Sequence, residues 1–203
     1  MKLLKLTFLI LAACASAPAF ADLSVFACEP HWAALVTEIG GTHVDVISAT
    51  GAYNDPHFIQ ARPSLISRMR RTDLVVCNGA DLEVGWLPVL LIQGDNDKVQ
   101  PGQPGYFDAS HDVHLLQVPT RVDRAMGDIH PYGNPHFQTD PRTIAAAAGD
   151  LAQRMETLDP ANAAEYQKRY ADFRTRWDAA MQKWEQEATD RKSTRLNSSH
   201  GII

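Results

Sequence analysis

The sequence has few of the features that mark the commonest enzyme classes. It contains no G-x-S-x-G nucleophile elbow, no glycine-rich phosphate loop and no H-E-x-x-H helix. Its three cysteines include no C-x-x-C pair of the kind used for thiol redox work. These absences argue against the corresponding hydrolase, nucleotide-binding and redox chemistries, and they direct attention to the eight histidines.

Long apolar runs are also scarce, and the one that is present lies at the N-terminus. Two lysines precede an apolar core at Leu6–Ala13, and Ala19-Phe20-Ala21 is a small-x-small cleavage site. Beyond this segment no apolar run is long enough to span a membrane. We therefore expect a signal peptide over residues 1–21 and an exported protein.

A second interpretation of the N-terminal segment stays open. Leu11-Ala12-Ala13-Cys14 fits the lipobox pattern, in which Cys14 becomes the lipidated N-terminus of a tethered protein. We favour cleavage after Ala21, because the first strand is expected to begin only two residues later.

The remaining chain is acidic. The sequence carries 19 Lys and Arg against 24 Asp and Glu, a net charge of −5, which becomes −7 when Lys2 and Lys5 leave with the signal. An acidic surface repels phosphate groups, so we expect no nucleic-acid partner.

From Asp22 onward, short apolar runs alternate with helical segments. Strands are predicted at Leu23–Cys28, His43–Ala49 and Asp73–Cys77, with helices at His31–Ile39 and Pro63–Arg71. Nearly continuous apolar strands in this order indicate an α/β fold with a parallel sheet flanked by helices on both faces. Ligands usually bind at the carboxyl ends of such strands, where His57 would lie.

The later part of the chain is first loop-rich and then helical. The predicted elements are an apolar helical segment at Ala80–Ile92 interrupted by Pro88, one short strand at Leu115–Val118, a long loop at Pro119–Asn134, and helices at Ile144–Leu158 and from Ala161 to about Thr189. The last helix carries an aromatic stripe that core packing explains best. At 1.5 Å per residue it would span about 45 Å, so we interpret it as a connector.

These patterns divide the chain into four parts. They are the signal peptide 1–21, an N-terminal α/β lobe 22–142 that carries the histidine motifs described below, a helical segment 143–190 with the start of the connecting helix, and a tail 191–203. The tail is polar and aperiodic and resembles translated linker sequence, so we expect it to be non-native and give His200 no function.

Two histidines occur in matching contexts. Asn54-Asp55-Pro56-His57-Phe58 and Asn134-Pro135-His136-Phe137 each place an imidazole directly after a proline. Neutral imidazole is a common metal ligand, and it benefits from an acceptor for its second ring nitrogen. We hypothesise that His57 and His136 share a metal ion. Asp55 and Asp140 are candidate acceptors, although Asp140 is better explained as the N-cap of the following helix.

Three further histidines are candidate accessory ligands. His111 and His114 occur in Ser-His-Asp-Val-His, and His130 lies in the loop before Asn134. For His111 and His114, a solvated position without metal remains the simpler interpretation.

Cys28 and Cys77 both end predicted strands. The ends of neighbouring parallel strands lie close enough for a disulfide, and an exported protein meets an oxidising environment. We predict a Cys28–Cys77 disulfide, with a pair of inert buried thiols as the alternative.

Taken together, these motifs resemble those of the periplasmic substrate-binding proteins of zinc and manganese ABC importers. The resemblance covers Asp22 to Ala188 and rests on Asp55-Pro56-His57 with Arg62-Pro63-Ser64, on Asp73–Val76 with Gly79–Glu83, and on Asn134-Pro135-His136 with Asp140-Pro141-Arg142. The segments Phe26–Pro30 and Gly127–His130 are most similar to the subgroup that receives zinc from a periplasmic metallochaperone.

The resemblance implies two α/β lobes joined by a long helix, with the ion held between them. His57 and His136 match the two histidines of the first lobe, while the remaining histidine and carboxylate belong to a second lobe that is missing here. It implies a monomeric zinc receptor without catalytic activity, in the periplasm, that delivers metal to an inner-membrane ABC permease. Zinc is expected over manganese because imidazoles suit a borderline metal.

Two other functions stay open. A secreted zinc metallohydrolase would bind metal through His57 and His136 and use Glu29 or Asp55 as general base, but the sequence identifies no third ligand. A metal-scavenging surface lipoprotein or adhesin would be favoured if Cys14 is lipidated.

Overall fold

The computed structural model describes residues 22–111, 113–123 and 130–199, with side chains as far as Arg191. The predicted signal peptide with Cys14, and His200, lie outside the described residues. A four-stranded sheet has the order β2-β1-β3-β4, and every pairing is parallel. The strands are β1 (Leu23–Ala27), β2 (Val44–Ser48), β3 (Leu74–Cys77) and β4 (Tyr106–Asp108). The predicted parallel α/β architecture is confirmed.

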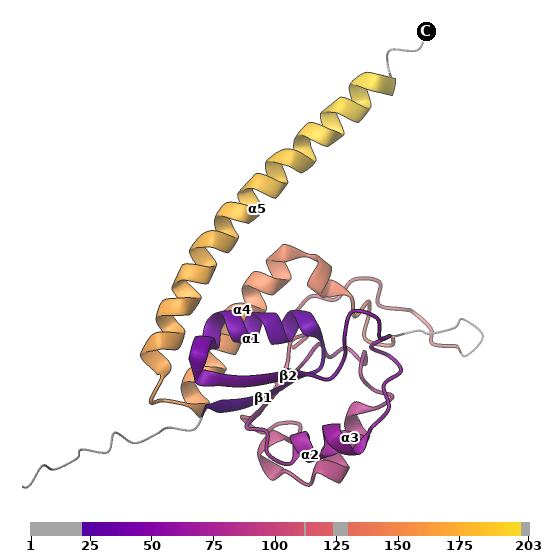
Figure 1. Ribbon diagram of the computed structural model, residues 1–203. Helices are drawn as coiled ribbons and strands as arrows, with labels where there is room; N and C mark the ends of the chain where they lie inside the picture. Colours follow the sequence, from indigo (N-terminus) through magenta and orange to yellow (C-terminus); the bar gives the residue numbers. More distant parts are fainter. Residues whose placement is uncertain (1–21, 112, 124–129, 200–203) are drawn as a thin grey trace, which may run out of the picture.

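Helices cover both faces of this sheet (Figure 1). The helices are α1 (Pro30–Gly40), α2 (Pro63–Met69), α3 (Leu87–Gly94), α4 (Pro141–Leu158) and α5 (Ala163–Ser199). Short 3₁₀ helices are described at Gly41–His43, Asp97–Val99 and Phe137–Thr139. Helices α1 and α4 lie on one face of the sheet and α2 and α3 on the other.

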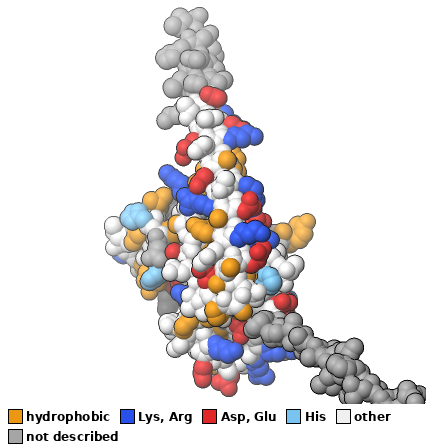
Figure 2. All heavy atoms as spheres, turned by 90° about the vertical axis from the view of Figure 1, so that its left-hand side faces the viewer, with side chains coloured by type: hydrophobic (Ala, Val, Ile, Leu, Met, Phe, Trp, Pro, Cys, Tyr) orange, Lys and Arg blue, Asp and Glu red, His pale blue; other side chains and the backbone are white. Residues whose placement is uncertain are grey.

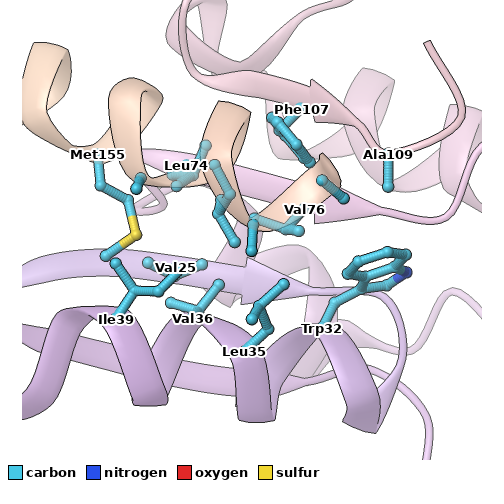
Figure 3. Packing of buried hydrophobic residues seen from close by; sticks show 14 of the residues in the cluster. Val25, Trp32, Leu35, Val36, Ile39, Leu74, Val76, Phe107, Ala109 and Met155 are labelled. Atoms are coloured by element: carbon cyan, nitrogen blue, oxygen red, sulfur yellow. The ribbon is translucent and has the colours of Figure 1, made fainter. Parts of the chain in front are cut away.

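The alternation of side chains along the strands builds two cores. Val25 and Leu74 belong to the core shared with α1, α4 and the beginning of α5, where Ile39 and Met155 meet them (Figure 3). Phe26 and the other alternate strand residues pack with α2 and α3. Because both faces are buried, the central strands are apolar at nearly every position.

The prediction of a helix over Ala80–Ile92 is wrong for the first half of this segment. Helix α3 begins only at Leu87, and Pro88 lies in its first turn. A proline is well accommodated there because the first N–H groups of a helix have no intrahelical partner. Ala80 and Asp81 instead have left-handed backbone angles, φ 52° and 63°. Pro88 therefore starts a helix that it was expected to interrupt.

The strand predicted at Leu115–Val118 is also absent from the described structure, and β4 takes its place in the sheet. Gln117 has φ 57°, which is incompatible with a strand, and the carbonyl of Leu116 accepts the backbone N–H of Asn134. The segment thus pairs with the loop that carries His136. Only three residues form β4, and pairing with β3 places Phe107 in the core.

Helix α5 begins in the core and continues beyond the globular body (Figure 1). Tyr166 is fully buried and Trp177 packs against the core, whereas Trp184 is 44% exposed. The aromatic stripe is therefore core only in its first part. The helix continues to Ser199, past the predicted end near Thr189, and charges of both signs alternate along it (Figure 2). In the described part of the chain, no helix is long and apolar enough to cross a membrane.

Candidate metal centre

The two proline-histidine motifs fold in the same way. The Oδ1 atom of Asp55 accepts the backbone N–H of His57 at 3.0 Å, and the Oδ1 atom of Asn134 accepts that of His136 at 2.9 Å. Such a turn needs an Asp or Asn two residues before the donor, and the intervening proline restricts the backbone further. The repeated sequence pattern is therefore a repeated structure, which presents one imidazole from each loop.

Three imidazoles meet where these loops converge. The ring centroid of His57 lies 5.7 Å from that of His136 and 5.2 Å from that of His130. The Nε2 atoms of His57 and His130 are 3.2 Å apart. All three histidines line one open cavity of about 490 Å³. The predicted pair is thus brought together, and His130 joins it.

Hydrogen bonds determine which nitrogen of His57 faces the other rings. Its Nδ1 atom lies 2.7 Å from the Asp55 carboxylate, which accepts the Nδ1 proton and leaves the lone pair of Nε2 directed at His130. The hydrogen bond from the His57 backbone, followed by the one from its ring, lowers the pKa of Asp55. The carboxylate therefore stays ionised and orients the imidazole.

Comparison with known proteins identifies the family of the chain. Residues 25–203 match the family model of ZnuA, described as the periplasmic component A of a zinc-uptake complex. The chain belongs to the ZnuA family.

Curated relatives of this ZnuA-family chain include the metal ABC transporter substrate-binding lipoprotein ScbA of Streptococcus cristatus. It is 26% identical over 174 residues, which cover 82% of this chain and 53% of the relative. The manganese ABC transporter substrate-binding lipoprotein PsaA of Streptococcus anginosus is 26% identical over 180 residues, covering 85% and 55%. The chain spans about half the length of the curated relatives it matches.

Solved structures of the ZnuA family share the fold. A zinc-bound ZnuA deletion mutant superposes with a TM-score of 0.67 at 21% identity, covering 81% of this chain and 58% of that one. The zinc-bound ZnuA-like domain of Streptococcus pneumoniae AdcA gives 0.62 at 18% identity, covering 78% and 53%.

His111 and His114 lie apart from the three converging histidines. Both are exposed and line a different cavity of about 670 Å³, whose described lining includes neither His57 nor His136. Sequence spacing alone could not separate them from His130, since all three occupy the same irregular stretch before Asn134.

Asp140 caps a helix, as predicted. Its side chain accepts the backbone N–H of Arg142 at 2.9 Å at the start of α4. The Arg142 guanidinium also donates to both carboxylate oxygens, and this contact is the main reason that the pKa of Asp140 is lowered. Both oxygens of Asp140 are therefore engaged with Arg142.

The predicted Cys28–Cys77 disulfide is present and joins the carboxyl ends of β1 and β3. Glu83 also lies within 4.8 Å of the two sulfur atoms, all of them buried. Disulfide sulfurs carry no thiolate, so this group lacks the ligand form that a metal requires. The disulfide therefore serves the fold.

Glu29 is unsuited to the general-base role considered above. It is only 3% exposed and is not among the described residues that line the three-histidine cavity. Burial, and then the negative charge of the nearby buried Glu83, raise the pKa of Glu29. Glu29 is therefore a protonated buried group, and the hydrolase alternative loses one of its two candidate bases.

Proposed function

We propose that this chain is the N-terminal lobe of an extracytoplasmic zinc receptor that captures the ion and hands it to an ABC permease. The observation that carries the proposal is the convergence of His57, His130 and His136 in one open cavity at the carboxyl ends of a parallel sheet. His57 and His136 are the principal ligands, and His130 is an additional one from the adjoining loop.

The donor set of this cavity supports zinc as the cargo. The Nε2 atoms of His57 and His130 are 3.2 Å apart, close enough for both to bind one ion. The only carboxylate lining this cavity among the described residues is that of Asp55, which is occupied by His57, so the described ligands are imidazoles. Manganese prefers oxygen ligands, and we therefore propose that zinc binds more tightly.

The role is binding and release without bond breaking, and a second lobe supplies the remaining ligands in the complete receptor. We propose that the protein acts as a monomer in the periplasm, with the permease as its main partner and a metallochaperone as a candidate zinc donor. Lipidation at Cys14 is the alternative for its location, since the curated relatives are named as lipoproteins. Mass spectrometry of the mature N-terminus distinguishes the two forms.

Calorimetric titration of Zn²⁺ and Mn²⁺ into the purified chain tests the proposal. We expect zinc to bind more tightly than manganese, and His57→Ala and His136→Ala each to weaken zinc binding at least tenfold. His111→Ala, which removes an exposed histidine of the other cavity, is the matched control. Equal zinc affinity in all four proteins would refute the assignment of the site.

A further inference from the structure

The peptide bond between proline and histidine is hydrogen-bonded at both ends in each motif. Its N–H donates to Asp55 or Asn134, as described above. Its carbonyl accepts a side-chain donor: Trp86 Nε1 donates to the Pro56 carbonyl at 2.7 Å, and Asn78 Nδ2 donates to the Pro135 carbonyl at 2.6 Å. Because the peptide unit is planar, two bonds on opposite edges determine its orientation, and with it the direction of the histidine side chain.

Both donors belong to one short segment, residues 78–86, which directly follows β3 and its disulfide. Asn78 and Trp86 are 0% and 1% exposed. Between them, the Glu83 carboxylate accepts the backbone N–H groups of Asn78 and Gly79 at 2.7 and 3.1 Å. Because both donors are buried and belong to the same short segment, that segment holds both histidine loops.

The backbone of this segment contains an unusual turn. Gly79, Ala80 and Asp81 are three consecutive residues with positive φ, a conformation that is unfavourable for the two that are not glycine. The turn is tied to the end of β4, because Ser110 accepts the Ala80 N–H and donates to Asp108. A Cβ atom added at Gly85 would lie 3.0 Å from the His57 carbonyl oxygen, so the segment also contacts the first loop directly.

We propose that Asn78 and Trp86 are positioning residues for the metal site. By holding the Pro56 and Pro135 carbonyls, they set the separation and orientation of the His57 and His136 imidazoles before metal arrives. The proposal rests on the proposed function, because it assigns these residues to the same zinc site. Neither residue is among those that line the three-histidine cavity, so their effect would reach a bound ion through the backbones of the two histidine loops.

The chain contains a matched control for this role. Trp177 also donates its indole N–H to a proline carbonyl, that of Pro141, at 2.8 Å. That bond joins α5 to the start of α4 and does not involve a histidine loop. Trp86→Phe and Trp177→Phe therefore remove the same kind of hydrogen bond and keep an aromatic ring in each place.

Zinc titration of both variants, alongside the unaltered chain and Asn78→Ala, tests the positioning role. Loss of a group that orients a ligand commonly costs 10- to 100-fold in metal affinity. We expect Trp86→Phe and Asn78→Ala to weaken zinc binding at least tenfold and to alter the visible absorption of bound Co²⁺. Trp177→Phe should change neither the zinc affinity nor the absorption of bound Co²⁺. Thermal unfolding of the metal-free proteins confirms that each variant is folded.

NMR spectra of the metal-free proteins keep the inference testable if a variant is unstable. The His57 ring resonances should shift in Trp86→Phe and stay in place in Trp177→Phe. Unchanged ring resonances in Trp86→Phe, or equal zinc affinity in Trp86→Phe and Trp177→Phe, would overturn the positioning role alone. Failure of the unaltered chain to bind zinc would overturn the proposed function and this role with it.

Discussion

His57 and His130 approach to 3.2 Å between their Nε2 atoms, although they are 73 positions apart in the chain. An Nε2–H of one ring can donate to the Nε2 of the other, and an ion bound by both rings would replace this hydrogen bond with two metal bonds. We therefore predict that His130→Ala weakens zinc binding about tenfold. Isothermal titration with Zn²⁺ measures this loss. His114→Ala, from the other cavity, should behave like the unaltered chain; equal losses in both variants would contradict the role of His130.

The same substitution should have different effects at Asp55 and Asp140: it should lower zinc affinity at Asp55 and unfolding free energy at Asp140. Asp55→Ala removes the acceptor that orients the His57 ring, so we expect zinc affinity to fall about 10- to 100-fold. Asp140→Ala removes a helix cap, so we expect about 1 kcal/mol lower unfolding free energy with unchanged affinity. Zinc titration and urea unfolding of both variants check this, and a loss of affinity in Asp140→Ala would show that its role was misassigned.

The disulfide should account for a large share of the stability. It joins Cys28 and Cys77, which are 49 positions apart, and chain entropy predicts about 4 kcal/mol for closing a loop of this length. We expect the Cys28→Ser/Cys77→Ser double variant to be about 2–4 kcal/mol less stable in urea unfolding. Reductant should lower the stability of the unaltered chain to the same level and leave the variant unaffected. Insensitivity of the unaltered chain to reductant would argue against this contribution.

Asn96 should be important for stability although it is not among the residues that line the three-histidine cavity. Its buried amide donates to the carbonyl of Met69, the last residue of α2, at 2.9 Å and to that of Thr72 at 2.8 Å. Asn96→Ala would leave two carbonyls without this donor, so we expect a loss of about 2–3 kcal/mol in unfolding free energy. Gln167→Ala, which removes an exposed bond to Glu156, should cost less than about 0.5 kcal/mol. Similar losses of unfolding free energy in Asn96→Ala and Gln167→Ala would contradict the stabilising role of the buried Asn96 amide.

Stability should decline at alkaline pH because of the buried Glu29 and Glu83. Burial raises the pKa of both carboxyl groups above the ordinary 4.5, so the native protein holds protons that the unfolded chain releases. Their contribution is complete below pH 4.5 and is lost as the pH rises, by about 1.4 kcal/mol per pH unit for one retained proton.

His31 opposes this trend at lower pH. Burial lowers its pKa from 6.5 to about 4, so its contribution is present above pH 6.5 and is lost as the pH falls. Below pH 6.5 His31 offsets the loss from one of the two carboxyl groups, and above pH 6.5 the decline is unopposed. Glu29→Gln, which imitates the protonated acid, should flatten the dependence of urea-unfolding free energy on pH between 6.5 and 8.5. A decline as steep as that of the unaltered chain would contradict this assignment.

Some of the architecture follows from local sequence alone. The parallel sheet could be predicted because β1 and β3 are apolar along nearly their whole length, and Asp140 because a cap and a following proline are neighbours in sequence. The Asx-Pro-His turns are local in the same sense, since the side chain of Asp55 or Asn134 binds a backbone group only two residues away. Interactions of this range depend little on the rest of the chain.

Other features required the tertiary structure. The three-residue strand β4 is stable only because β3 offers it hydrogen bonds, so its own residues carried too little signal. The choice of His130 over His111 and His114 depends on which loop lies against His57, a contact across 73 positions. The sequence pattern places Trp86 in an apolar helix, and its bond to the Pro56 carbonyl exists only because the fold brings the two segments together. The sequence determined the chemical groups and their local turns, whereas long-range packing decided which of them meet.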